Sequence, residues 1–108
     1  MRSHHKMKDI VAETKVKMTS PAGESKLVVI EIGRPYSISN DEAACPISMH
    51  GLYPKIKDLH GVDTLQALAL AFEFIRITMQ KWEEKGYIFE FQNGASLPEN
   101  IWFEDRKK

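Results

Sequence analysis

The sequence predicts an α+β fold, in which an antiparallel sheet of three to four strands is covered on one face by one long helix at about 63–85. Alternation of apolar and polar residues in the first half of the chain is typical of strands. Residues 63–85 instead repeat apolar side chains at spacings of three and four, as in an amphipathic helix. With 108 residues, 43% of them hydrophobic, residues 1–108 are expected to form a single domain with a frayed basic arm at about 1–8.

The first two strands are predicted from alternation and from the turn between them. Alternate residues from Ile10 to Met18 share one face, and charged residues share the other. The segment TSPAGES contains Pro21 and Gly23 and predicts a turn. The segment KLVVIEIG is rich in β-branched residues and ends at Gly33. Together these segments predict an antiparallel hairpin.

A loop and a third strand are predicted next. Pro35 interrupts the segment RPYSISNDEA, which is interpreted as a loop. The segment ACPISMHGL is interpreted as a strand, with these residues on one face: Cys45, Ile47 and Met49. Pro46 has no N–H donor, so this strand is expected to begin there or to lie at a sheet edge. The segment YPKIKDLHG is interpreted as the connection to the helix.

The helix is predicted with both of its ends. Asp63 is a candidate N-cap, and Gly86 is a favoured residue for the C-terminal end. One stripe is expected to face the core: Leu65, Leu68, Phe72, Ile75, Met79 and Trp82. Three apolar residues lie off that stripe: Leu70, Phe74 and Ile77. Either the C-terminal segment covers these three residues or they form part of an interface.

The chain after the helix predicts a fourth strand at Tyr87–Phe91, with alternate aromatic residues on one face. The segment QNGAS then predicts a turn. For residues 97–103 the sequence does not distinguish a short helix from a final strand.

The side chains that carry chemistry do not converge in the sequence. Cys45 and His50 lie five positions apart on a predicted strand, so they are expected on opposite faces and not as a nucleophile pair. His4 and His5 are adjacent but lack further ligands, and are interpreted as a tag remnant or a plain tail. We therefore expect no catalytic residues, no cofactor and no metal site.

Charge is balanced overall but unevenly distributed. The net charge of zero argues against nucleic-acid binding, and the longest apolar run, at residues 65–72, is too short to cross a membrane. Residues 1–26 carry six Lys/Arg and three Asp/Glu, a balance of +3. Residues 83–105 carry six Asp/Glu and one Lys, a balance of −5, which is either a solvated rim or a partner-binding segment. The candidate partner-binding residues are Glu83, Glu84, Glu99, Trp102, Phe103, Glu104 and Asp105.

One part of the sequence resembles a family of small bacterial proteins of unassigned function. The resemblance covers about residues 27–80 and is carried by Cys45-Pro46, Gly51-Leu52 and the helix opening GVDTLQAL. It implies no activity and no catalytic residues. By type, the chain also looks like the immunity proteins of bacterial toxin–immunity pairs, including contact-dependent growth inhibition systems.

These observations lead to the expectation of a cytoplasmic immunity protein. It would neutralise a cognate toxin domain, such as a basic nuclease, by forming a protein–protein complex. The single cysteine fits a reducing compartment, since it cannot form an internal disulfide. Two alternatives stay open: a small-molecule-binding or enzymatic domain with a pocket between sheet and helix, and a structural homodimer through the helix.

Overall fold

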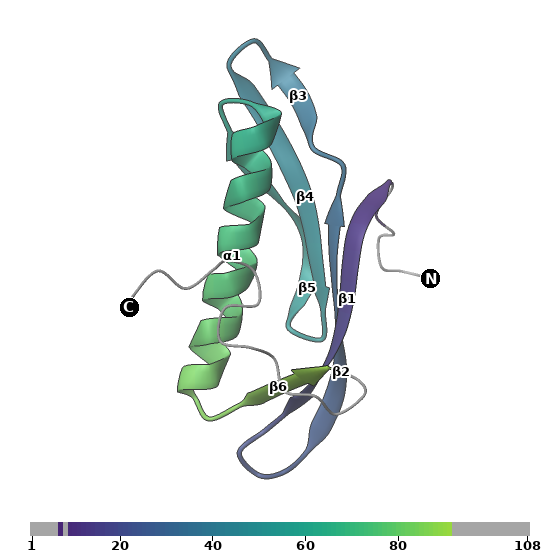
Figure 1. Cartoon of the computed structure of the whole chain (residues 1–108), viewed down its shortest axis with the longest axis vertical. Helices are drawn as coiled ribbons and strands as arrows, with labels where there is room; N and C mark the ends of the chain where they lie inside the picture. Colours follow the sequence, from purple (N-terminus) through teal and green to yellow (C-terminus); the bar gives the residue numbers. More distant parts are fainter. Residues whose placement is uncertain (1–6, 8, 92–108) are drawn as a thin grey trace.

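The protein folds as a curled antiparallel sheet of six strands with one long helix against it (Figure 1). The computed structural model describes residue 7 and residues 9–91. The elements are β1 (Ile10–Thr19), β2 (Ser25–Gly33), β3 (Tyr36–Ser39), β4 (Glu42–His50), β5 (Tyr53–Gly61), α1 (Thr64–Glu84) and β6 (Ile88–Phe91). The prediction of three to four strands is therefore wrong.

The two unpredicted strands are β3 and β5. β3 lies inside the predicted loop: its sequence, YSIS, alternates apolar and polar side chains, but it has only four residues, and all four are exposed. β5 occupies the segment that was interpreted as a connection to the helix. Most of its side chains are exposed, and it includes Pro54, Lys55 and Lys57, residues that are common on edge strands. Backbone pairing, rather than side-chain burial, defines both strands.

β4 is the central strand, because it pairs with three others. Ile47 pairs with Ile32 of β2 and with Lys57 of β5, so these two strands lie on opposite edges of β4. Ala44 pairs in the same way with β3 and β5, so β2 and β3 share one edge. The prediction that Pro46 begins a strand or lies at a sheet edge is wrong. Pro46 lies between the ladders to β2 and β3, where a missing N–H donor is tolerated.

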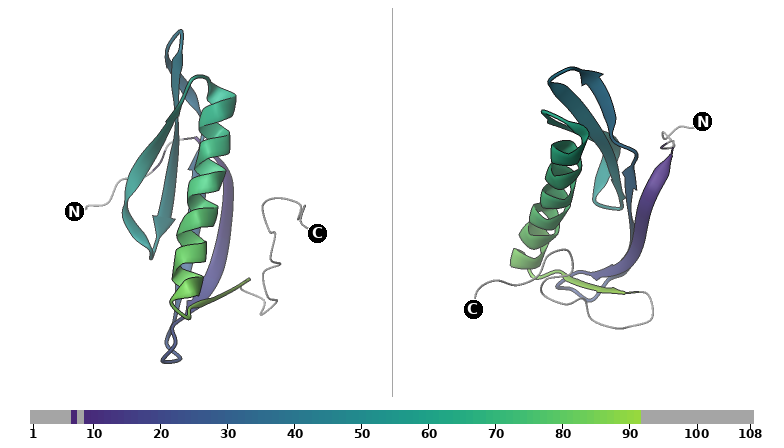
Figure 2. Two further views of the ribbon diagram at one scale, coloured as in Figure 1. Left: turned by 90° about the vertical axis from the view of Figure 1, so that its left-hand side faces the viewer. Right: turned by 45° about the horizontal axis from the view of Figure 1, so that its top comes forward.

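The remaining ladders join β1 to β2 and β1 to β6. β1 and β2 pair over their whole lengths, which confirms the predicted hairpin. β6 pairs with the last part of β1, from Val16 to Thr19. Figure 2 shows the curl of the sheet, with α1 alongside β4 and β5 and β6 crossing near the C-terminal end of the helix.

The core lies between α1 and the inner face of the sheet. Cys45, Ile47 and Met49 point to this face, as predicted for β4. The helix contributes a buried row at a spacing of four: Ala67, Ala71, Ile75 and Met79. The predicted helix stripe was partly wrong, because Leu65 is 75% exposed while Leu68, Phe72 and Trp82 are only partly buried. The small alanine side chains allow close approach, so the helix turns its alanine row toward β4 and β5.

Both ends of α1 form as predicted. The Asp63 carboxylate accepts the Gln66 N–H at 2.8 Å, and the Gln66 side chain accepts the Val62 N–H at 2.8 Å. At the other end Gly86 has a φ of 96° and donates to the Glu83 carbonyl, while Tyr87 donates to the Trp82 carbonyl. These bonds form a Schellman motif, which satisfies free carbonyls of the last turn. Among the described residues, no helix is both long and apolar enough to cross a bilayer.

Candidate functional site

The predicted partner-binding segment is only partly within the described structure. Glu83 and Glu84 lie in the last turn of α1, and partial desolvation of its carboxyl raises the pKa of Glu83. Next to them, the Trp82 ring packs edge-to-face on Tyr87, with 4.8 Å between centroids. The other predicted residues lie outside the described residues: Glu99, Trp102, Phe103, Glu104 and Asp105. Recognition by this segment therefore stays a prediction.

Cys45 lies where thiolate chemistry is disfavoured. Its side chain is fully buried, and its thiol contacts the Gly33 carbonyl with 3.6 Å between sulfur and oxygen. Burial, followed by the negative charge of Asp58, raises the pKa of the Cys45 thiol from 9.0 to about 11. Because the thiolate is the nucleophile, Cys45 acts here as a small core residue.

Ser48, His50 and Glu31 form a cluster that sequence reasoning did not identify. These side chains lie on the outer face of the sheet, away from α1. The Ser48 hydroxyl donates to the Glu31 carboxylate at 2.9 Å and lies 3.4 Å from His50 Nε2, and the same carboxylate oxygen lies 3.5 Å from that nitrogen. In a hydrolytic triad the serine and the acid contact different ring nitrogens. The cluster therefore joins β2 to β4 and does not activate Ser48.

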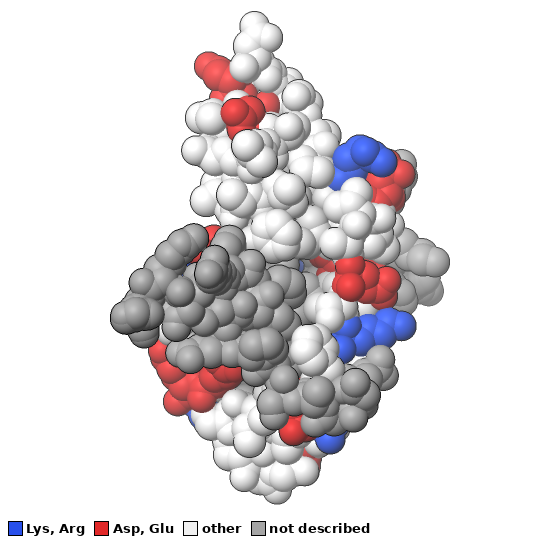
Figure 3. All heavy atoms as spheres, in the orientation of Figure 1, with Lys and Arg blue, Asp and Glu red and all other residues white. Residues whose placement is uncertain are grey.

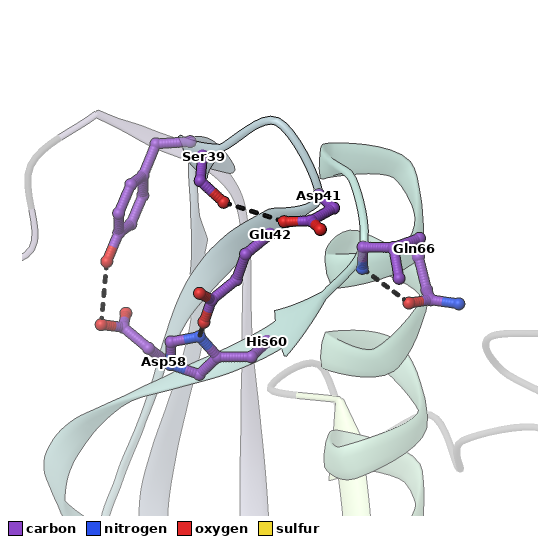
Figure 4. Close-up of polar contacts among 8 residues, drawn as sticks. Ser39, Asp41, Glu42, Asp58, His60 and Gln66 are labelled. Carbon is purple, nitrogen blue, oxygen red and sulfur yellow. Dashed lines mark hydrogen bonds and ion pairs between the residues drawn. The ribbon is translucent and has the colours of Figure 1, made fainter.

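Another outer-face cluster lies near the turn between β3 and β4 (Figure 4). Tyr36 on β3 pairs with Ala44 on β4, and its hydroxyl donates to the Asp58 carboxylate on β5 at 3.0 Å. The tyrosine ring therefore crosses β4, which helps to explain why the outward-facing Ala44 is fully buried. The hydrogen bond to Asp58, more than burial, raises the pKa of Tyr36, so the phenol stays the donor.

Two more contacts fix carboxylates in this cluster. His60 Nδ1 on β5 lies 3.0 Å from a Glu42 carboxylate oxygen on β4, and Ser39 donates to Asp41 at 3.2 Å. The Glu42 and His60 side chains are both about half exposed. Asp41 and Glu42 belong to the segment predicted as a loop, and His60 belongs to the segment predicted as a connection to the helix. Only the pairing of β5 with β4 brings Glu42 and His60 together.

We call this part of the molecule the hairpin end and define it as residues 36–42 and 58–65. These two ranges contain four carboxylates and no Lys or Arg: Asp41, Glu42, Asp58 and Asp63. They also present four exposed apolar side chains: Tyr36 (45% exposed), Ile38 (48%), Val62 (56%) and Leu65 (75%). Figure 3 shows acidic atoms and no basic ones at this end of the molecule in the view drawn. Exposed apolar side chains rimmed by polar ones are typical of an interaction surface.

The flank of α1 beside β5 carries a smaller apolar group. Leu70 and Ile77 are each about one third exposed, and the Phe74 ring packs edge-to-face on Tyr53. The Lys57 ammonium lies 5.4 Å from the centre of the Phe74 ring. Phe74 therefore packs largely against β5, which leaves Leu70 and Ile77 as the more accessible of the three residues off the predicted stripe. The C-terminal segment that was the alternative cover for them, with its undecided element at 97–103, lies outside the described residues.

The part of the chain that the structure describes contains no cluster of metal-binding side chains. No group of three or more His, Cys, Asp or Glu side chains there could hold a metal ion. His4 and His5 lie outside the described residues.

The protein is thus a small domain with a curled six-stranded antiparallel sheet and one helix, and its hairpin end carries both carboxylates and exposed apolar side chains. The chain belongs to the family described as Domain of unknown function (DUF6968), whose match covers residues 13–96. That range includes all of the hairpin end. Comparison with curated proteins and with solved structures gave no match.

Proposed function

We propose that this protein is a protein-binding domain that neutralises a partner, a toxin domain, by forming a complex in the cytoplasm. The observation that carries the binding role is the exposure of four apolar side chains among carboxylates at the hairpin end. Aromatic and aliphatic side chains anchor protein interfaces, while surrounding charges set the rate of association. Neutralisation follows if the bound surface of the partner overlaps its active cleft.

Hydrogen bonds within the hairpin end support a binding surface that is already ordered before the partner binds. Tyr36 is held by Asp58, Glu42 by His60, and Asp41 by Ser39 before any partner arrives. Leu65 lies in the first turn of a capped helix. A surface fixed in this way loses less conformational entropy on binding, which increases affinity.

Site-specific photo-crosslinking in the native host tests this proposal. A benzophenone amino acid is placed at Ile38 in one variant and, as a control, at Ile88 in another. Ile88 is also an exposed isoleucine, but it lies in β6 and outside the hairpin end. We expect one protein to be crosslinked from position 38 and not from position 88. Crosslinks from position 88 alone would move the binding surface away from the hairpin end, toward the predicted segment after Glu83.

The neutralising role needs its own measurement. The crosslinked partner, expressed alone, should arrest growth, and co-expression of the parent protein should restore it. A double variant with Ile38→Ser and Leu65→Ser should fail to restore growth although it folds. A partner that is harmless when expressed alone would refute the immunity role and leave the binding role standing.

A further inference from the structure

We infer that the hairpin end recognises a basic partner segment, one that presents Lys or Arg side chains next to an exposed apolar side chain. This inference rests on the proposed protein-binding function and specifies the chemistry of the partner. It follows from two observations: the four carboxylates are hydrogen-bonded but have no Lys or Arg partner among the described residues, and exposed apolar side chains occur in the same part of the molecule.

The carboxylates of the hairpin end are fixed in place without being neutralised by Lys or Arg. Asp58 accepts from the Tyr36 hydroxyl, Asp41 from the Ser39 hydroxyl and Asp63 from the Gln66 backbone N–H. Glu42 contacts His60. The Lys and Arg ion pairs found among residues 9–91 all lie elsewhere: Lys17–Glu90, Arg34–Asp9 and Arg76–Glu73. The negative charge at this end is therefore oriented and uncompensated by any Lys or Arg of the described chain.

Oriented carboxylates favour a cationic partner for two reasons. A guanidinium or ammonium group forms charge-assisted hydrogen bonds with the remaining carboxylate lone pairs. Burying these carboxylates under a neutral or acidic surface would instead remove their hydration without compensation. The backbone phosphates of nucleic acid and an acidic protein surface are thus both disfavoured.

The exposed apolar side chains indicate that positive charge alone is not enough for the partner. At the hairpin end, Tyr36 and Ile38 on β3 are exposed, and so are Val62 and Leu65 at the start of α1. Burial of such side chains needs an apolar group on the partner. A second copy of this chain does not fit, since a two-fold contact would bring the same surface together and oppose four carboxylates with four.

The test uses a displayed library of random twelve-residue peptides, selected for binding to the intact parent protein. The affinity of the selected peptides is then measured for two pairs of variants. In each pair one variant changes the hairpin end, and its control makes the same kind of change elsewhere. Glu42→Gln with Asp58→Asn removes two charges from the hairpin end, and Glu13→Gln with Glu24→Gln removes two exposed charges elsewhere. Ile38→Ser removes an apolar side chain at the hairpin end, and Ile88→Ser removes one outside it. Thermal melts verify that every variant is folded.

We expect the selected peptides to be enriched in Lys or Arg together with an aliphatic or aromatic residue. Their affinity should fall roughly tenfold on Glu42→Gln with Asp58→Asn, and the salt dependence should weaken, because two complementary charges are lost. The Glu13→Gln with Glu24→Gln control should bind within about twofold of the parent, because distant exposed charges are screened.

Three outcomes would overturn the inference. Peptides without cationic residues that nevertheless lose affinity on Ile38→Ser would refute the basic partner and leave the proposed binding function standing. Peptides that bind all variants equally would refute both the partner chemistry and the location of the surface. The inference would also be refuted if no peptide is enriched on the parent relative to a triple variant with Ile38→Ser, Glu42→Gln and Asp58→Asn. The crosslinking experiment in the host tests the proposed function separately.

Discussion

Ile75 and Ile77 provide a matched pair that tests how α1 packs on the sheet. Both are isoleucines in the middle of the same helix, but Ile75 is 0% exposed and Ile77 is 36% exposed. Replacing either by alanine removes the same three carbon atoms and has the same effect on helix propensity. The difference between the two losses therefore reports burial alone.

The magnitude follows from the burial of each side chain. Three buried carbon groups at about 0.8 kcal/mol each give about 2.4 kcal/mol of lost transfer free energy for Ile75→Ala. The cavity left in the core between α1 and the sheet raises this loss to about 3–4 kcal/mol, because a packed core relaxes only partly. At Ile77 the alanine substitution leaves no closed cavity, because the site is open to solvent. We therefore expect Ile77→Ala to lower the free energy of unfolding by less than about 1.5 kcal/mol.

Urea unfolding followed by circular dichroism measures both losses. The slope of unfolding free energy against urea should match the parent for both variants, since neither changes the surface exposed on unfolding. A loss at Ile77 equal to or larger than the loss at Ile75 would show that α1 is rotated relative to the sheet. The assignment of Ala67 and Ala71 to the buried row would then fail as well.

Three further predictions concern single residues. Leu65→Ala should cost less than about 0.5 kcal/mol of unfolding free energy in urea melts, although the sequence pattern places Leu65 in the core, because the side chain is mostly exposed; a loss above about 2 kcal/mol would contradict this. Gly61→Ala should cost about 1–3 kcal/mol, because its Cβ would lie 2.8 Å from the backbone nitrogen of Ala67 in the first part of α1; an unchanged melt would show that this approach is looser. Native Cys45 should resist thiol reagents near neutral pH and react on unfolding, because it is buried with a pKa of about 11. The folded state binds the thiol proton more tightly than the unfolded state, so stability should fall as pH rises from about 9 to about 11, and Cys45→Ala should lose that part of the pH dependence; parallel stability profiles for the parent and the variant would contradict it.

Residues with a local physical role could be assigned from the sequence alone. The β1–β2 hairpin follows from alternation and from a turn containing Gly23, whose φ is +94°. Asp63 and Gly86 end the helix because a cap depends on a few neighbouring backbone groups. Cys45 was correctly predicted on the buried face of its strand, since side chains alternate along any strand.

Features that depend on distant pairing could only be decided by the tertiary structure. β3 and β5 are strands because β4 offers them backbone partners, while most of their own side chains are exposed. The helix rotation likewise depends on which row fits closely against β4 and β5, and the small Ala67 and Ala71 fit better there than the larger Leu65. Tyr36 meets Asp58, and Glu42 meets His60, across gaps of 22 and 18 positions, so the hairpin end exists only once the sheet has formed. Composition and local pattern determine what each segment prefers, whereas long-range hydrogen bonding and close packing select which segments become neighbours.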